Sequence, residues 1–522
     1  MSSSFFTILE RGRIKLVTIM WAARARIKFS FLLICSFFVS LVQTFPIQLH
    51  RERQQRQRSD TGAMPLQRRE FLNVGATASF WGLFPILPSP AVEESSAFVK
   101  KHKFSSFDPR PPALEGYDPE NAAIYPQAGQ SYFPALTPPF KSRATYRYEL
   151  GRNTWALEQL LTFANVTATI RTIVVQMQDG GLWVNGPLYP TNEYCHLLNE
   201  LGTVQHLVVP CNAIEHKAPL QAFITKYPNV QSVWISPGQY GPLGECGLTL
   251  NDKNKPCRMG CHIDGILPTM TAIKEQHRKD MQILDLPPWA NEFDFQTLYV
   301  ELPQNAGPVS EVAFLHKPTK TLITTDSVVY IPDKAPPIFD TYFVKGETKK
   351  DPAFWPKTVL QSVFLPLRRV VYESEDSDSS DEGEEGGYSS NSSGDSSGSS
   401  VDHEGSNWPG YDAIRNTLIR APILRSFVDA RAPDAVREWV ESISSGMDFD
   451  RIVTAHFASP IRATPRYFRN AFGYLFEDGA VDALPEISCQ DWELLGSIND
   501  FIDSNGLGAP VVFDFRKGCV AE

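Results

Sequence analysis

Cysteine and long hydrophobic runs are both scarce in this chain. Eight cysteines among 522 residues are too few for a disulfide-dense scaffold. An apolar run extends from Phe29 to Val42, and its roughly 14 residues are fewer than the about 20 that a transmembrane helix requires. Because 42% of the residues are hydrophobic and 21% are charged, the composition also excludes a wholly disordered chain and a polytopic membrane protein.

Charge is distributed unevenly along the chain. Residues 1–91 carry 12 Lys and Arg against 4 Asp and Glu, a net charge of +8. Residues 92–522 carry 37 against 55, a net charge of −18. A basic segment before an acidic body favours a removable targeting leader over a nucleic-acid-binding protein, so we expect no nucleic-acid partner.

The first part of this leader has the pattern of a signal peptide. Arg24, Arg26 and Lys28 precede the apolar run, and cleavage near Thr44 would leave Phe45 at the new terminus. A stretch rich in arginine and poor in acids follows, as in transit peptides. Together these two parts resemble the bipartite plastid leader of algae with complex plastids. A single anchor helix is the alternative interpretation of the apolar run.

A twin-arginine pattern ends the leader. Arg68-Arg69-Glu70-Phe71-Leu72 precedes a mildly apolar stretch from Val74 to Leu87, and Ser89-Pro90-Ala91 resembles a small-residue cleavage site. We therefore expect a cleavable leader over 1–91 and a mature protein in the thylakoid lumen of a plastid, without an integral membrane span. The plastid stroma and a secretory-route membrane anchor are the alternative locations. A loop and short helix of the mature protein would also produce this pattern.

The mature chain is predicted to be an α/β sandwich of mixed sheets with outer helices. Residues 104–143 are rich in proline, which favours an extended arm or linker. Strands and helices then alternate over 144–345 and again over 408–505. The expected strands are Thr169–Met177, Leu182–Leu188, Gln205–Pro210, Val230–Ser236, Phe295–Glu301, Glu311–Leu315, Thr321–Thr325 and Arg451–Ala455. The expected helices cover 191–201, 218–227, 411–443, 464–476 and 488–502.

Two insertions are expected in this sandwich. Residues 240–280 contain Cys246, Cys257, Cys261 and His262, which could bind zinc, form a disulfide or do redox work; their spacing matches no compact zinc motif. Residues 373–407 contain 11 acidic residues and no Lys or Arg among Ser and Gly, and this composition predicts disorder.

Polar residues follow three of the predicted strands directly. Glu215 and His216 come shortly after Val208-Val209-Pro210, Asp326 follows a strand ending at Thr325, and His456 follows one ending at Ala455. Strand ends supply binding sites in sandwiched α/β sheets. Two histidines and two carboxylates meeting there would suit one divalent metal ion, Zn²⁺, Fe²⁺ or Mn²⁺.

This layout resembles the metallo-β-lactamase-like superfamily, in which His-x-His-x-Asp-His follows a strand, a bridging Asp ends a later strand, and a last His ends a strand near the C-terminus. The resemblance implies an αββα sandwich. The chain looks closer still to an uncharacterised family of cyanobacterial, algal and plant plastid proteins with a degenerate metal motif. Three segments carry that match: Glu215-His216-Lys217, the segment that runs from 311–317 through 325–329, and residues 450–461.

The departures from the superfamily motif affect mainly one of its two metal sites. Aligning His216 with the last motif histidine places Cys211 and Ala213 on the two leading ones. The intermediate histidine would fall at Pro237-Gly238-Gln239 and is absent. The resemblance therefore implies at most one metal, held by Glu215, His216, Asp326 and His456. Cys211 could join as a thiolate or be a small buried residue.

Two functions follow from this set of residues. The first is a single-metal-dependent hydrolase of an ester, thioester or amide, in which Asp326 is catalytic and positions the attacking water. The second is a non-catalytic binding or assembly protein in which the same residues are the hydrogen-bonded remnant of a dead site. The substrate or protein partner is not identified by the sequence. His316, at a turn between two strands, is expected to be exposed.

Overall fold

The computed structural model describes residues 113–114, 123–127, 143–163, 166–239, 261–272, 286–302, 307–342, 351–369, 408–476, 487–505 and 509–521. The predicted leader 1–91 and the predicted acidic insertion 373–407 lie entirely outside these ranges. Cys246 and Cys257 also lie outside them, so their zinc, disulfide and redox interpretations stay predictions. Cys261 is described and has a free thiol.

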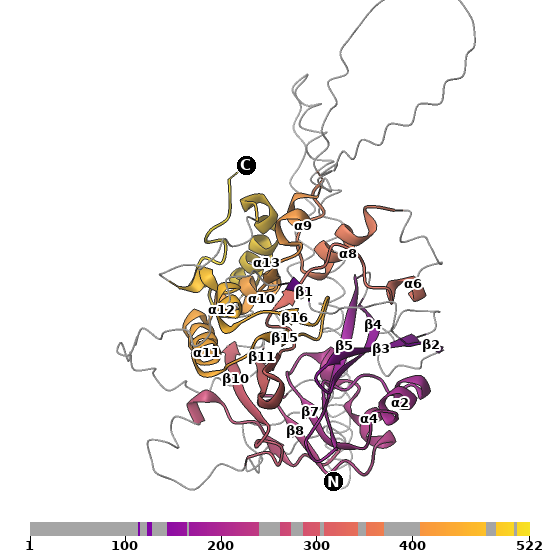
Figure 1. Ribbon diagram of the computed structural model, residues 1–522. Coiled ribbons are helices and arrows are strands. Elements are labelled where there is room, and N and C mark those ends of the chain that lie inside the picture. Colours follow the sequence, from indigo (N-terminus) through magenta and orange to yellow (C-terminus); the bar gives the residue numbers. More distant parts are fainter. Residues whose placement is uncertain are drawn as a thin grey trace, which may run out of the picture.

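Two large β-sheets form the centre of the molecule (Figure 1), and a third sheet has two strands. The eight-stranded sheet has the order β2-β3-β4-β5-β6-β7-β8-β9, antiparallel from β2 to β6 and parallel from β6 to β9. Its strands are β2 (Ala123–Gln127), β3 (Arg143–Gly151), β4 (Thr154–Phe163), β5 (Val166–Gln176), β6 (Leu182–Asn185), β7 (Val204–Val209), β8 (Ser232–Ile235) and β9 (Gly265–Ile266).

The six-stranded sheet has the order β1-β16-β15-β12-β11-β10, and only its β12–β15 pair is parallel. Its strands are β1 (Ala113–Leu114), β10 (Phe293–Leu302), β11 (Gly307–His316), β12 (Thr321–Ile323), β15 (Arg451–Val453) and β16 (Ile461–Arg462). The small sheet pairs β13 (Val329–Tyr330) with β14 (Leu418–Ile419).

The strands are apolar on both faces, and successive residues pack into different layers. Trp183 of β6 and Phe314 of β11 belong to one buried cluster between the two sheets. Their neighbours Val184 and Leu315 instead belong to two separate clusters on the outer faces. Because side chains alternate across a strand, this pattern requires a layer of structure on each outer face as well as a shared core.

Helices supply those outer layers. On the eight-stranded sheet they are α2 (Asn192–Asn199) and α4 (Leu220–Lys226), and on the six-stranded sheet α11 (Pro433–Gly446) and α12 (Pro465–Asn470), on opposite sides in Figure 1. The layer order helix–sheet–sheet–helix confirms the predicted α/β fold class, an αββα sandwich of mixed sheets with outer helices. The remaining helices are α3 (Ile214–Lys217), α6 (Phe339–Tyr342), α8 (Phe354–Ser362), α9 (Pro409–Ile414), α10 (Pro422–Leu424) and α13 (Glu493–Ser504).

Local sequence signals account for several of these elements. In the hairpin between β5 and β6, Gly180 has a φ of +86° and the Gly181 amide donates to Asp179 Oδ1 at 2.9 Å. The Thr191 hydroxyl accepts from the amide of Tyr194 and caps α2, as its position predicted.

The single helix predicted over 411–443 is wrong. The segment contains α9, β14, α10, a π-helix over Arg425–Asp429, and α11. Pro422 and Pro433 each lie in the first turn of a new helix, because proline has no amide to continue a preceding one. Pairing of β14 with β13 extends the chain between α9 and α10.

A disulfide that the sequence did not predict joins Cys489 to Cys519. It ties the segment after α13 back to the 3₁₀ turn that precedes this helix, where the Cys489 amide also donates to Val520 O at 2.9 Å. Within the described ranges, no helix is both long enough and apolar enough to cross a membrane.

Candidate metal centre

Two of the candidate residues come from adjacent parallel strands. Ile323 of β12 pairs with Val453 of β15 in register. Asp326 and His456 are each the third residue beyond that pair. Parallel strands end at the same edge of a sheet, so the two side chains leave the sheet together.

The other two candidates come from the opposite sheet. Beyond β7 the chain crosses to β11: the Val312 amide donates to Pro210 O at 2.8 Å, and Cys211 forms an isolated bridge with Glu311. Since β11 is the neighbour of β12, this crossing brings α3, with Glu215 and His216, to the edge where β12 ends.

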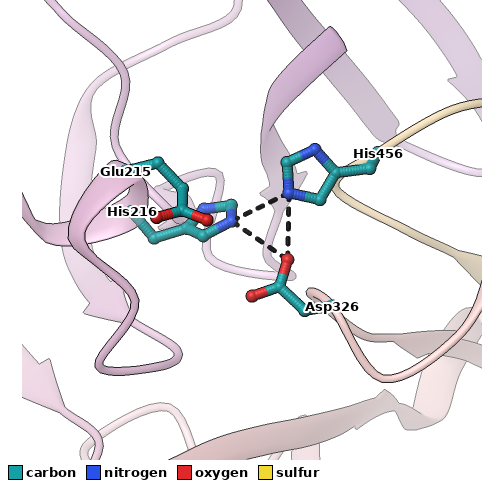
Figure 2. A group of neighbouring side chains, drawn as sticks. All are labelled: Glu215, His216, Asp326 and His456. Carbon is teal, nitrogen blue, oxygen red and sulfur yellow. Dashed lines mark hydrogen bonds and ion pairs between the residues drawn. The ribbon is translucent and has the colours of Figure 1, made fainter. Parts of the chain in front are cut away.

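The four side chains converge there (Figure 2). His216 Nε2 lies 3.2 Å from His456 Nε2 and 3.5 Å from Asp326 Oδ1. His456 Nε2 lies 2.9 Å from the same Asp326 oxygen. With a carboxylate oxygen of Glu215, the four donor atoms all lie within 4.8 Å of one another. In the described part of the chain this is the one group of at least three acidic, His or Cys side chains so arranged.

A hydrogen bond at the ring nitrogen Nδ1 fixes the orientation of the His456 side chain. Its Nδ1 lies 2.6 Å from the carbonyl oxygen of Thr169, which can only accept, so Nδ1 carries a proton and donates. The Thr169 hydroxyl also accepts from the Phe457 amide at 3.0 Å, where the backbone has a φ of +54°. The His456 ring therefore presents Nε2 to the site. No motif or pattern around Thr169 predicts this role.

Charge is concentrated in the cluster. Burial alone would raise the pKa of the Asp326 carboxyl, but His216 and His456 hold that pKa well below its usual range. Burial would lower the pKa of His456, and its hydrogen bond and attraction to Asp326 raise it instead. The side chain of His216 is fully buried, and its Nδ1 has no hydrogen-bond partner among the described residues.

The residues that the sequence resemblance aligns with a second metal site are packed into this structure. Cys211 is buried, and burial raises the pKa of its thiol well above the ordinary value. Its Sγ lies 3.8 Å from Asp326 Oδ2. Gln239 is buried too, and its Nε2 donates to Cys211 O at 2.9 Å and to Ser236 Oγ at 2.8 Å. These residues hold the β7 and β8 ends together.

Two other histidines lie away from the cluster. The expectation that His316 is exposed is wrong: it is 2% exposed, its Nδ1 lies 2.7 Å from Thr319 Oγ1, and its Nε2 lies 3.7 Å from Glu292. The side chain folds back over its own turn, which a strand-end position does not reveal. His262, beside Cys261, is 85% exposed and pairs with Asp264 at 3.3 Å.

A family model described as "Domain of unknown function (DUF4336)" matches residues 152–474, which include all four residues of the cluster. No curated protein matches the chain. The predicted closeness to cyanobacterial, algal and plant plastid proteins stays a prediction.

Solved structures with some likeness include two metallo-β-lactamases. The enzyme from Hirschia baltica is 7% identical, over 42% of this chain and 84% of that one, with a TM-score of 0.21. The enzyme from Pontibacter korlensis is 10% identical over the same shares, with a TM-score of 0.22. The metal-soaked Flv1 flavodiiron core from Synechocystis sp. PCC6803 is 9% identical, over 64% of this chain and 61% of that one, with a TM-score of 0.29. Such low TM-scores carry no inference about ligand or activity.

Proposed function

The chain belongs to the family of the domain of unknown function DUF4336, and because that description gives no activity, we propose a function from the site alone. Glu215, His216, Asp326 and His456 bind one divalent metal ion. This ion serves the hydrolysis of an ester, thioester or amide.

The observation that carries the proposal is the triangle formed by the two histidine Nε2 atoms and Asp326 Oδ1. Its edges are 2.9, 3.2 and 3.5 Å. Metal bonds near 2.1 Å would separate neighbouring ligand atoms by about 3.0 Å in octahedral and about 3.4 Å in tetrahedral geometry. The edges therefore fit donors to one small cation.

The surroundings of His456 fit a ligand role as well. A metal-binding imidazole usually donates its other N–H to a carbonyl or carboxylate, which fixes the ring and its tautomer. The bond from His456 Nδ1 to Thr169 O has this form. Two imidazole nitrogens and two carboxylates are ligands that Zn²⁺, Fe²⁺ and Mn²⁺ all accept, so the donor set does not select among the three.

The residues of this chain would divide the work of the reaction. Lewis acidity toward a water molecule or a substrate carbonyl is the chemistry that the cation would supply. Asp326 has a second oxygen, Oδ2, which lies 3.8 Å from the Cys211 Sγ donor and would also accept from a water molecule bound at the site. We assign Asp326 the positioning of the attacking water through this oxygen.

A site for a second metal is not part of the proposal. The sequence resemblance places Cys211 and Ala213 on the two leading histidines and Pro237-Gly238-Gln239 on the intermediate one, and the Gln239 amide is bonded to backbone and hydroxyl oxygens. A two-metal clamp would need ligands that these residues do not provide.

The functional test uses the full mature chain freed of metal and then loaded with Zn²⁺, Fe²⁺ or Mn²⁺ in turn. Each form is assayed against p-nitrophenyl esters, an acyl thioester and an anilide. We expect metal-dependent turnover of at least one class, lost in H456A and retained in H206A, whose histidine lies outside the cluster and contacts Ser232. Turnover that is equal with and without metal, or equal in H456A, would contradict the proposal.

A non-catalytic binding protein is the second candidate, and one observation favours it. The Asp326 carboxylate, 2.9 Å away, raises the pKa of His456 by a hydrogen bond and by attraction, and this pairing stabilises the cluster without any cation. Metal binding with no hydrolysis of any substrate class would support a binding protein with a structural ion. The absence of both would support a remnant site.

We also propose that the protein acts in the thylakoid lumen of a plastid. The pattern Arg68-Arg69-Glu70-Phe71-Leu72 before an apolar stretch supports this location. Import of the radiolabelled precursor into isolated plastids, with Arg68 and Arg69 both replaced by Lys as the control, tests it. Protease-protected mature protein in the thylakoid fraction of the wild type alone is expected. Equal processing of both precursors would contradict it.

A further inference from the structure

Glu311 is a buried acid beside the cluster to which the sequence assigned no role. It lies on β11 and is 4% exposed. Its Oε1 accepts from three successive backbone amides, those of Thr325 at 2.9 Å, Asp326 at 3.1 Å and Ser327 at 3.0 Å. One side-chain oxygen therefore holds the whole turn that carries Asp326.

Three successive amides that point at one oxygen form an anion-binding concavity in the backbone. Such amides need an acceptor when they are buried, because a buried unpaired N–H bears its full cost of desolvation. The chain leaves β12 at Ile323 and has no strand partner over this turn. Glu311 thus accepts from amides that a neighbouring strand would otherwise pair. Hydrogen bonds to a charged acceptor are roughly twice as strong as those between neutral groups.

Arg420 holds the other side of the same turn. Its Nη1 donates to Ser327 O at 3.1 Å. Its Nε and Nη2 donate to the two oxygens of Asp429 at 3.1 and 2.8 Å, in the paired arrangement that fixes a guanidinium plane. The turn is therefore fixed through its amides by Glu311 and through a carbonyl by Arg420.

The arrangement brings two carboxylates close together. Burial raises the pKa of Glu311, the Asp326 charge raises it further, and Arg420 and the backbone amides act in the opposite direction. A second buried carboxylate beside Asp326 makes the electrostatic potential at the cluster more negative, which favours a cation there.

We propose that Glu311 is a positioning residue that, together with Arg420, holds Asp326 where it can bind the cation. This inference rests on the proposed metal site. It predicts that Glu311, which does not reach the cation itself, controls its affinity through the backbone of residues 325–327.

The test compares E311A and E311Q with the wild type and with E292A. Glu292 is a matched control, since it is also buried and also accepts a backbone amide, that of Gln178, but lies near the His316 end of β11. Three quantities are measured: the dissociation constants of Zn²⁺ and Co²⁺ by competition with a chromophoric chelator, the visible spectrum of the Co²⁺ form, and amide hydrogen exchange of residues 325–327 in metal-free protein.

E311A is expected to weaken metal binding by about 10- to 100-fold, the range seen when groups that orient metal ligands are removed. Its Co²⁺ spectrum should change, and exchange at 325–327 should rise. E311Q keeps an oxygen that accepts the three amides, so we expect a smaller loss, about 3- to 10-fold. E292A should leave the affinity within about twofold of the wild type. If E311A does not fold, E311Q decides the matter.

Two outcomes would overturn the inference, and they differ from each other. If the wild type binds metal and both Glu311 variants bind it with unchanged affinity and spectrum, the positioning role is wrong and the metal site stands. If the wild type binds no metal, the proposed function fails, and the inference fails with it.

Discussion

Asp326 and His456 lie 2.9 Å apart, from Oδ1 to Nε2, just beyond the ends of two adjacent parallel strands. The two strands come from parts of the chain that are 130 residues apart, and their register alone aligns the two side chains. Without a cation, a proton on Nε2 joins the two atoms in a hydrogen bond; with a cation, both atoms would bind the ion instead. The pair therefore explains both why the cluster forms and why its metal content has to be measured.

Breaking the buried ion pair of Glu158 and Arg171 should destabilise the fold strongly. The two side chains are 0% and 1% exposed, and Arg171 Nε lies 2.6 Å from Glu158 Oε2. R171M leaves the Glu158 charge without its partner, so we expect the free energy of unfolding in urea to fall by about 3 to 5 kcal/mol. The double variant E158L/R171M removes both charges and should recover most of that loss. A double variant as unstable as R171M would contradict this explanation.

Loss of the disulfide should also lower stability. Cys489 and Cys519 are 30 residues apart, and a cross-link over such a loop contributes about 3 to 4 kcal/mol by restricting the unfolded chain. We expect the variant C489S/C519S, or the reduced wild type, to lose about that much free energy of unfolding. The free Cys195 provides the control, and C195S should change stability by less than 1 kcal/mol. Equal stability of the oxidised and reduced wild type would exclude a stabilising role for the bond.

The buried His316 should make stability depend on pH. Burial lowers its pKa in the folded protein to about 4, against about 6.5 in the unfolded chain. Between these values the unfolded state binds the proton and the folded state does not. Above pH 6.5 the titration of His316 therefore does not change the free energy of unfolding. As the pH drops through 6.5 toward 4, this free energy falls by up to about 3 kcal/mol.

The comparison that isolates this effect is H316Q, which cannot titrate. Unfolding free energies of both proteins at a series of pH values between 4 and 7.5 give the difference. The wild type should lose stability relative to H316Q as the pH falls. Parallel pH profiles would show that His316 titrates normally in the fold.

Sequence patterns predicted strands and helices of this fold, and strand-end positions together with the resemblance to the metallo-β-lactamase-like superfamily predicted the four residues of its cluster. Apolar strands such as Val204–Val209 are visible as runs, and the polar residues that end them are adjacent in sequence. The contacts of Glu311, Thr169 and Arg420 could not be predicted. Each joins segments that are distant in sequence, and neither a strand pattern nor a residue type indicates which backbone amide or carbonyl a side chain will meet.

The same limit explains the incorrect expectation for His316. A histidine at the end of a strand is exposed when it continues the strand direction, and buried when it turns back over the loop. Its contacts with Thr319 and Glu292 decide between the two. Glu292 belongs to the loop before β10, 24 residues earlier, so the sequence near His316 carries no information about it.

The metal content of the purified mature chain is the most direct test of the account. Protein is dialysed against equal concentrations of Zn²⁺, Fe²⁺ and Mn²⁺ without oxygen, then freed of unbound ions and analysed by inductively coupled plasma mass spectrometry. We predict one ion per chain in the wild type and in the control H206A, and less than about a tenth of that in H216A, D326N and H456A. A wild type without bound metal, or cluster variants that bind as much as the wild type, would contradict the central claim.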